Sequence, residues 1–91
     1  MKIYTDVFKK PVTVDDVRTA TAVIVRSNKV SPSLLQRQMK MGYGKSATII
    51  RLLEDAGVVT EQSNTKPRSL IFKNEATAIN AALRQLRKGN A

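Results

Sequence analysis

The chain contains neither cysteine nor histidine, and it has only seven acidic residues. The first absence excludes a disulfide, a thiolate metal site and a cysteine nucleophile. The second removes the most common general base and metal ligand. The only adjacent acidic residues are Asp15-Asp16 and Glu54-Asp55, and neighbours on a helix point in different directions, so neither pair makes an obvious acid–base dyad. We therefore expect no enzymatic activity, no metal and no cofactor.

The chain also lacks a long hydrophobic run. No stretch approaches the roughly 18 apolar residues of a membrane span. The N-terminal sequence "MKIYTDVFKKP" places Lys and Asp where a signal peptide would be continuously apolar. We expect a cytoplasmic protein that does not interact with a membrane.

Positive charge is abundant. Sixteen Lys and Arg give a formal charge of +9 in 91 residues, a length that makes one small domain without room for a large enclosed active site. Such a charge indicates an anionic partner, because Lys and Arg displace counterions from it. Nucleic acid, an anionic membrane surface and an acidic protein all fit this charge, but since no membrane interaction is expected, the sequence pattern has to decide between nucleic acid and an acidic protein.

The N-terminal third predicts an arm followed by a helix. Residues 1–12 mix apolar and basic side chains without a helical period, which is typical of an extended arm. Residues 13–16, "TVDD", resemble a capping box with acidic side chains in the first helical turn. The run "TATAVIVR" is rich in β-branched residues, so a strand is the alternative. The cap and the length of the periodic segment favour a helix.

Two further helices are predicted in the middle of the chain. Ser31 can cap a helix and Pro32 suits its first position, so a short helix begins here and runs through Lys40. The clearest apolar periodicity covers residues 44–56, and Gly57 follows it as a left-handed C-cap. These helices are separated by a short turn.

The last third predicts a wing and a fourth helix. "VVTEQ" and "SLIFK" read as two strands around the polar turn "SNTKPR". An amphipathic helix over 74–88 is expected to pack on this wing or to form a homodimer seam. The prediction is an α+β, mainly α, fold: a winged helix-turn-helix of three helices and a β-hairpin at 13–73, with an arm at 1–12 and a C-terminal helix at 74–91.

The stretch "MGYGKSATII" raises the question of a nucleotide-binding loop, because Gly-Lys-Ser ends such a loop. The first Gly of the motif would stand at Met39, and the preceding "SPSLLQRQMKM" is a poor strand. We therefore interpret the stretch as the turn of a helix-turn-helix, which often contains Gly. We expect Gly42 to adopt a conformation that residues with a β-carbon avoid, and Tyr43 to pack in the turn.

The run "VSPSLLQRQMKMGYGKSATIIRLLEDAGVVTEQ" resembles the C-terminal gamma domain of the FtsK/SpoIIIE family of DNA translocases. Its most specific points are Gln36-Arg37, Gly42-Tyr43, Glu54 and the run "AGVV" at 56–59. The resemblance implies a winged-helix module that binds short, asymmetric sites on double-stranded DNA and touches the XerD recombinase.

The chain departs from that family where the bases are read. After Gly-Tyr the family usually has Asn-Arg-Ala-Ala-Arg, with a Glu three residues further on. Here the five positions are "GKSAT" at 44–48, and Arg51 stands in place of the Glu. Because direct readout depends on donors and acceptors matched to particular base edges, we expect a DNA target different from the G-rich orienting sequence of the family.

The winged-helix fold predicts which residues meet double-stranded DNA. The second helix of the motif lies in the major groove, so its outward residues read bases, while the preceding helix and the wing contact phosphates. The recognition-helix candidates are Gly44, Lys45, Ser46, Thr48 and Arg51. The candidates on the preceding helix are Ser31, Ser33, Gln36, Arg37 and Lys40, and those on the wing are Asn64, Thr65, Lys66 and Arg68.

Two functions from different classes fit these features of the sequence. The favoured one is a stand-alone, sequence-specific DNA-binding protein, either a small transcription regulator or a DNA-organising factor of the nucleoid. The alternative is a protein-interaction winged helix that acts on a recombinase or a DNA translocase, with the basic surface facing an acidic partner. Retention of random duplex DNA at low salt separates the two.

Overall fold

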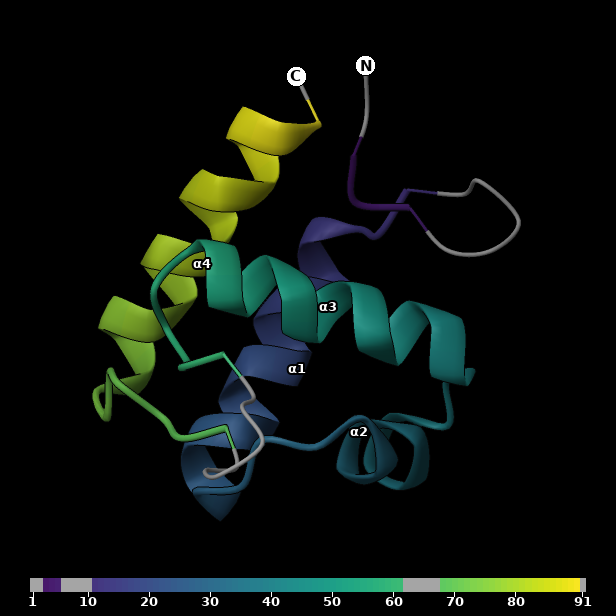
Figure 1. The fold of residues 1–91 in the computed structure, drawn as a ribbon, viewed down its shortest axis with the longest axis horizontal. Helices are drawn as coiled ribbons and strands as arrows, with labels where there is room; N and C mark the ends of the chain where they lie inside the picture. Colours follow the sequence, from purple (N-terminus) through teal and green to yellow (C-terminus); the bar gives the residue numbers. More distant parts are fainter. Residues whose placement is uncertain (1–2, 6–10, 62–67, 91) are drawn as a thin grey trace.

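The computed structural model describes residues 3–5, 11–61 and 68–90. They contain four helices, α1 (Val14–Ser27), α2 (Pro32–Met39), α3 (Tyr43–Asp55) and α4 (Glu75–Gly89) (Figure 1). The predicted mainly helical fold is therefore confirmed. None of the helices in the described ranges is long and apolar enough to cross a bilayer.

Helix α1 begins at a complete capping box, as predicted. The Thr13 hydroxyl accepts from the Asp16 backbone N–H at 3.1 Å, and the Asp16 carboxylate accepts from the Thr13 N–H at 3.2 Å. The cap satisfies two backbone N–H groups at the start of the helix, and the buried residues Val17, Ala20, Thr21 and Ile24 recur at helical spacing, which favours a helix over a strand. Asn28 ends the helix with a left-handed φ of 55°.

The turn between α2 and α3 differs from the prediction. Lys40, directly after α2, carries the left-handed backbone with a φ of 53°, whereas Gly42 is extended with a φ of −72°. The expectation that Gly42 needs a conformation reserved for glycine is therefore wrong. A left-handed residue at the end of α2 already reverses the chain, so the next two residues can be extended. As a result α3 begins at Tyr43, and Gly44 lies in its first turn.

After α3, two segments of the chain pair over a short length. Gly57 has the predicted left-handed φ of 76°. Val59 and Leu70 then form an isolated antiparallel bridge, and the Thr60 N–H donates to the Ser69 carbonyl at 2.8 Å. Outside the gap at 62–67, which the structure does not describe, this pairing is too short to be a strand. The predicted β-hairpin wing is not confirmed.

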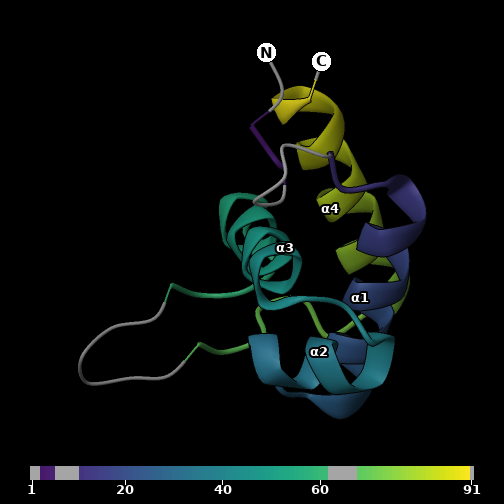
Figure 2. The same cartoon turned by 90° about the vertical axis from the view of Figure 1, so that its right-hand side faces the viewer.

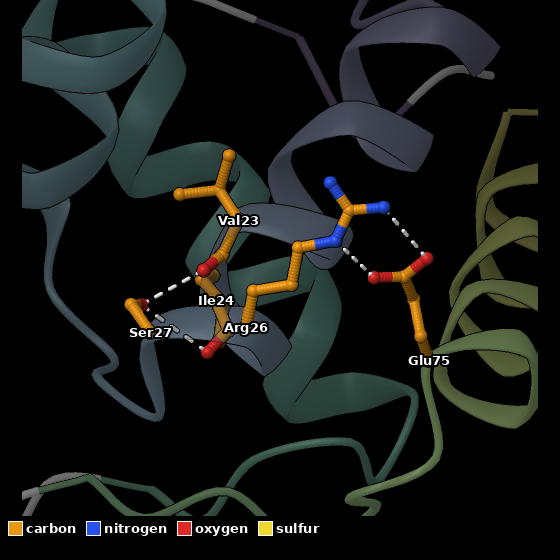
Figure 3. A network of polar contacts seen from close by, with 5 residues as sticks. All are labelled: Val23, Ile24, Arg26, Ser27 and Glu75. Carbon is orange, nitrogen blue, oxygen red and sulfur yellow. Dashed lines mark hydrogen bonds and ion pairs between the residues drawn. The ribbon is translucent and has the colours of Figure 1, made fainter.

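Helix α4 is an integral part of the core. It packs mainly against α1 and more lightly against α3, with Ala78, Ala82 and Leu86 buried (Figure 2). Its apolar stripe shares one core cluster with residues of α1 and α3, and Leu70 and Phe72 of the predicted wing pack against that cluster, while the homodimer stays a prediction. Where the last turn of α1 meets the first turn of α4, Arg26 donates to both carboxylate oxygens of Glu75, at 2.6 and 3.2 Å (Figure 3).

The N-terminal arm is partly built into this core. Tyr4 is fully buried and Val12 nearly so, and the Val12 N–H donates to the Tyr4 carbonyl at 3.1 Å. Residues 3–5 lie near the end of α4 and along one edge of α3 (Figure 1). The arm therefore borders the helix that the sequence assigns to DNA recognition.

Candidate nucleic-acid interface

Helix α3 presents one buried and one outward face. Its buried residues are Ser46, Ile49, Ile50, Leu52 and Leu53. By helical periodicity the opposite face carries Gly44, Arg51 and Asp55, with Tyr43 and Ala47 on the side toward α2. On this opposite face, Arg51 and Asp55 are exposed to solvent. The outward face of α3 is therefore the candidate interface.

Arg51 is the basic residue of this outward face, and the arm holds it in place. Helix α3 contains two basic residues, Lys45 and Arg51. The Arg51 Nη2 donates to the Ile3 carbonyl at 2.5 Å, and the guanidinium carbon lies 5.6 Å from the centre of the Tyr4 ring. The side chain remains exposed, and a guanidinium has five N–H donors, so one such bond leaves others free to bind a base edge.

Lys45 is turned toward α1. Its ammonium nitrogen lies 2.8 Å from Asp16 Oδ2, with about a third of the Lys45 side chain exposed. Burial raises the pKa of the Asp16 carboxyl, but the bonds from Lys45 and Thr13 outweigh this and hold the pKa below its usual value. The predicted guanine donor thus serves as a tie between α1 and α3.

Two other predicted readers also have partners within the chain. Ser46 is fully buried, and its hydroxyl donates to the Gly42 carbonyl at 3.0 Å. The Thr48 hydroxyl donates toward the carbonyls of Gly44, at 2.8 Å, and Thr5, at 3.0 Å. The structure thus does not bring Lys45, Ser46 and Thr48 together as a base-reading set.

Most of the residues on and beside α2 that are predicted to contact phosphates are more exposed than Lys45, Ser46 and Thr48. Ser33, Arg37 and Lys40 are exposed, and Gln36 is half-buried. Ser31 caps α2 by accepting from the Ser33 N–H at 3.2 Å. These residues remain candidates for contact with a DNA backbone.

Tyr43 is the functional candidate that sequence reasoning missed. We expected it to pack in the turn, but 64% of it is exposed, and it borders a shallow hollow between the start of α2 and α3. The hollow is lined by Val30, Ser31, Pro32, Ser33, Tyr43, Ala47 and Arg68. The sequence prediction began this helix at Gly44 and so left Tyr43 in the turn, whereas the structure places Tyr43 in the first turn of α3.

The wing contributes one described candidate. Arg68 Nε donates to Glu54 Oε1 at 2.8 Å, and both side chains are largely buried. This ion pair joins the segment after the gap to α3. The predicted contacts Asn64, Thr65 and Lys66 lie outside the described residues.

Comparison with known proteins finds a match over the region that contains α2 and α3. The family model described as the Ftsk gamma domain matches residues 15–73. The DNA translocase FtsK of Caldanaerobacter subterraneus subsp. tengcongensis is 39% identical over 56 residues, which cover 62% of this chain and 8% of the translocase. The Clostridium acetobutylicum translocase is 32% identical over 56 residues, 62% of this chain and 7% of that protein. The Borreliella burgdorferi translocase is 38% identical over 53 residues, 58% of this chain and 7% of that protein.

The chain therefore spans less than a tenth of the length of these curated relatives. No solved structure matches it. The matched region contains α1 without its first residue, α2, α3 and the segment through Lys73. It leaves out the arm and helix α4.

Proposed function

The chain belongs to the FtsK gamma domain family, and we propose that it binds double-stranded DNA in a sequence-specific manner with α3 as the recognition helix. The observation that carries the proposal is the outward face of α3, which presents exposed Arg51 in a chain of net charge +9. A basic chain with an accessible helix after a short turn is suited to duplex DNA.

In this proposal Arg51 reads a base in the major groove. Arginine is the most common partner of the guanine O6 and N7 acceptors, and such a contact requires a helix that approaches the groove closely. Gly44 and Ala47 border Arg51 on α3 with little or no side chain, which favours that approach. Lys45, Ser46 and Thr48 are then support residues that fix the orientation of α3.

Phosphate contacts surround this reader. We assign them to Ser33, Arg37 and Lys40 on the α2 side and to the hydroxyl of Tyr43, because these groups are exposed beside α3. Lys66 remains a proposed wing contact on the basis of its sequence position. Arg68 is reassigned to holding Glu54.

A small transcription regulator or a DNA-organising factor of the nucleoid is the role that this binding mode supports, with no catalytic step in it. The second candidate is a protein-interaction module that acts on a DNA translocase or a recombinase. Its support is that the relatives matching this region are DNA translocases, of which the chain covers less than a tenth.

A binding assay on random duplex DNA with a salt titration tests the proposal. We expect retention at low salt and a steep linear fall of log K with log salt, because each neutralised phosphate releases a counterion. Selection from a random oligonucleotide pool then gives the preferred sequence. No retention of any duplex at low salt would leave only the protein-interaction role.

A further inference from the structure

The two segments outside the family match, the arm and the end of α4, are joined to each other. The Ile3 N–H donates to the Gly89 carbonyl at 3.2 Å. The Tyr4 N–H donates to Asn90 Oδ1 at 2.9 Å, and the Asn90 amide donates back to the Tyr4 carbonyl at 3.3 Å. We call Ile3, Tyr4, Thr5, Gly89 and Asn90 the terminal clamp.

Tyr4 anchors the terminal clamp between α3 and α4. Its hydroxyl donates to Asp55 Oδ2 at 2.6 Å and accepts from the Gln85 amide at 2.9 Å. A β-carbon at Gly89 would stand 2.3 Å from the Tyr4 ring, closer than real contacts allow. The ring therefore sits at a fixed depth that depends on glycine at position 89.

The clamp also contacts two side chains of α3, those of Thr48 and Arg51. The Ile3 carbonyl accepts from Arg51, the Tyr4 ring lies under the Arg51 guanidinium, and the Thr5 carbonyl accepts from Thr48. The clamp thus acts on residues that are 43 to 48 positions away in the sequence. It does so from one edge of α3 and leaves Arg51 exposed.

We infer that the terminal clamp is a specificity device: it holds the Arg51 guanidinium in one orientation before DNA arrives, and Tyr4 is the positioning residue. This inference rests on the proposed DNA binding by α3. A free arginine samples many rotamers and must be ordered on binding, whereas a held one is ordered in advance and favours only bases that match its geometry. The clamp therefore increases discrimination more than it increases general attraction to phosphate.

A double-mutant cycle on DNA binding tests the inference. The clamp is weakened by Tyr4→Phe, which keeps the ring and removes both hydroxyl bonds, or by Gly89→Ala, which displaces the ring. Each variant is made with Arg51 and with Arg51→Gln, and affinity is measured for the selected site and for random duplex. Circular dichroism and thermal melting show that each variant is folded.

With Arg51 present, we expect either clamp variant to lower the ratio of selected-site to random-duplex affinity by about five- to tenfold, within the range of a single base contact. In the Arg51→Gln background we expect the clamp substitutions to change this affinity ratio by less than about twofold, because the residue that the clamp positions is absent. Random-duplex affinity of each clamp variant should stay within about twofold of the protein that has the intact clamp and the same residue at position 51.

Two results would overturn the inference while leaving the proposed function standing. Equal losses with and without Arg51 would show that the clamp is only structural. A gain in affinity for every duplex in the clamp variants would show that it covers the interface as a lid. If the parent protein binds no duplex at all, the proposed function itself fails, and the inference fails with it.

Discussion

Lys45 and Asp16 form a half-buried ion pair, with 2.8 Å between the ammonium nitrogen and Oδ2, that joins α3 to the first turn of α1. A sequence comparison alone places Lys45 among the base readers. In the structure its ammonium group is paired with Asp16 of α1, and its base-reading role stays a prediction that mutation can test. The two roles predict different effects of mutation, because loss of an ion pair between helices lowers stability, whereas loss of a base contact changes the DNA sequence that is bound.

We expect Lys45→Met to lower the free energy of unfolding by about 1–2 kcal/mol, since it leaves the partly buried Asp16 carboxylate without its partner. The selected DNA sequence should not change. Urea denaturation and oligonucleotide selection measure the two effects, and Lys29→Met at an exposed position is the matched control. A changed DNA consensus sequence with unchanged stability would show that Lys45 contacts a base.

The same pair predicts a dependence of stability on pH. The pKa of Asp16 is lower in the folded protein than its usual value, so the unfolded state binds more protons as the pH falls. The stabilisation is complete above the unfolded pKa of about 4 and disappears as the pH drops through the lower folded pKa. Urea denaturation of the parent protein and of Asp16→Asn should therefore give stabilities that converge between about pH 5 and pH 2. A stability difference between the two proteins that stays constant over this pH range would contradict a lowered pKa of Asp16.

Arg51 and Arg37 should differ in what they contribute to DNA binding. We expect Arg51→Ala to cost about 1–3 kcal/mol on the selected site and to relax the preference at one base pair. Arg37→Ala should weaken binding to all duplexes alike and reduce the salt slope by about 1. Oligonucleotide selection and salt titrations on both variants make the comparison. Uniform weakening by both substitutions would place Arg51 on a phosphate.

Helix α4 should be necessary for folding, although it lies outside the family match. Leu86→Ala should lower the free energy of unfolding by about 2–4 kcal/mol, because it removes buried methyl groups. Arg87→Ala, at an exposed position on the same turn, should change it by less than about 0.5 kcal/mol. Thermal or urea unfolding measures both. Equal and small effects would mean that α4 is a detachable addition.

Helix boundaries were predictable from the sequence because the groups that set them are close in the chain. The Thr13 capping box, the Ser31 cap and the left-handed Gly57 each involve residues within a few positions of one another. The fourth helix was predictable from its periodicity for the same reason. The partner of its apolar stripe was not, because α1 is distant in the sequence.

The sequence by itself determined four helices, their approximate ends, a basic chain and the resemblance to a DNA-binding family. Only the tertiary structure decided which side chains of α3 remain free. Lys45 is held by Asp16, Thr48 by the Thr5 carbonyl, and Tyr43 is left exposed. Periodicity gives the direction in which a side chain leaves its helix, but whether something already occupies that direction depends on segments that fold against the helix from far along the chain.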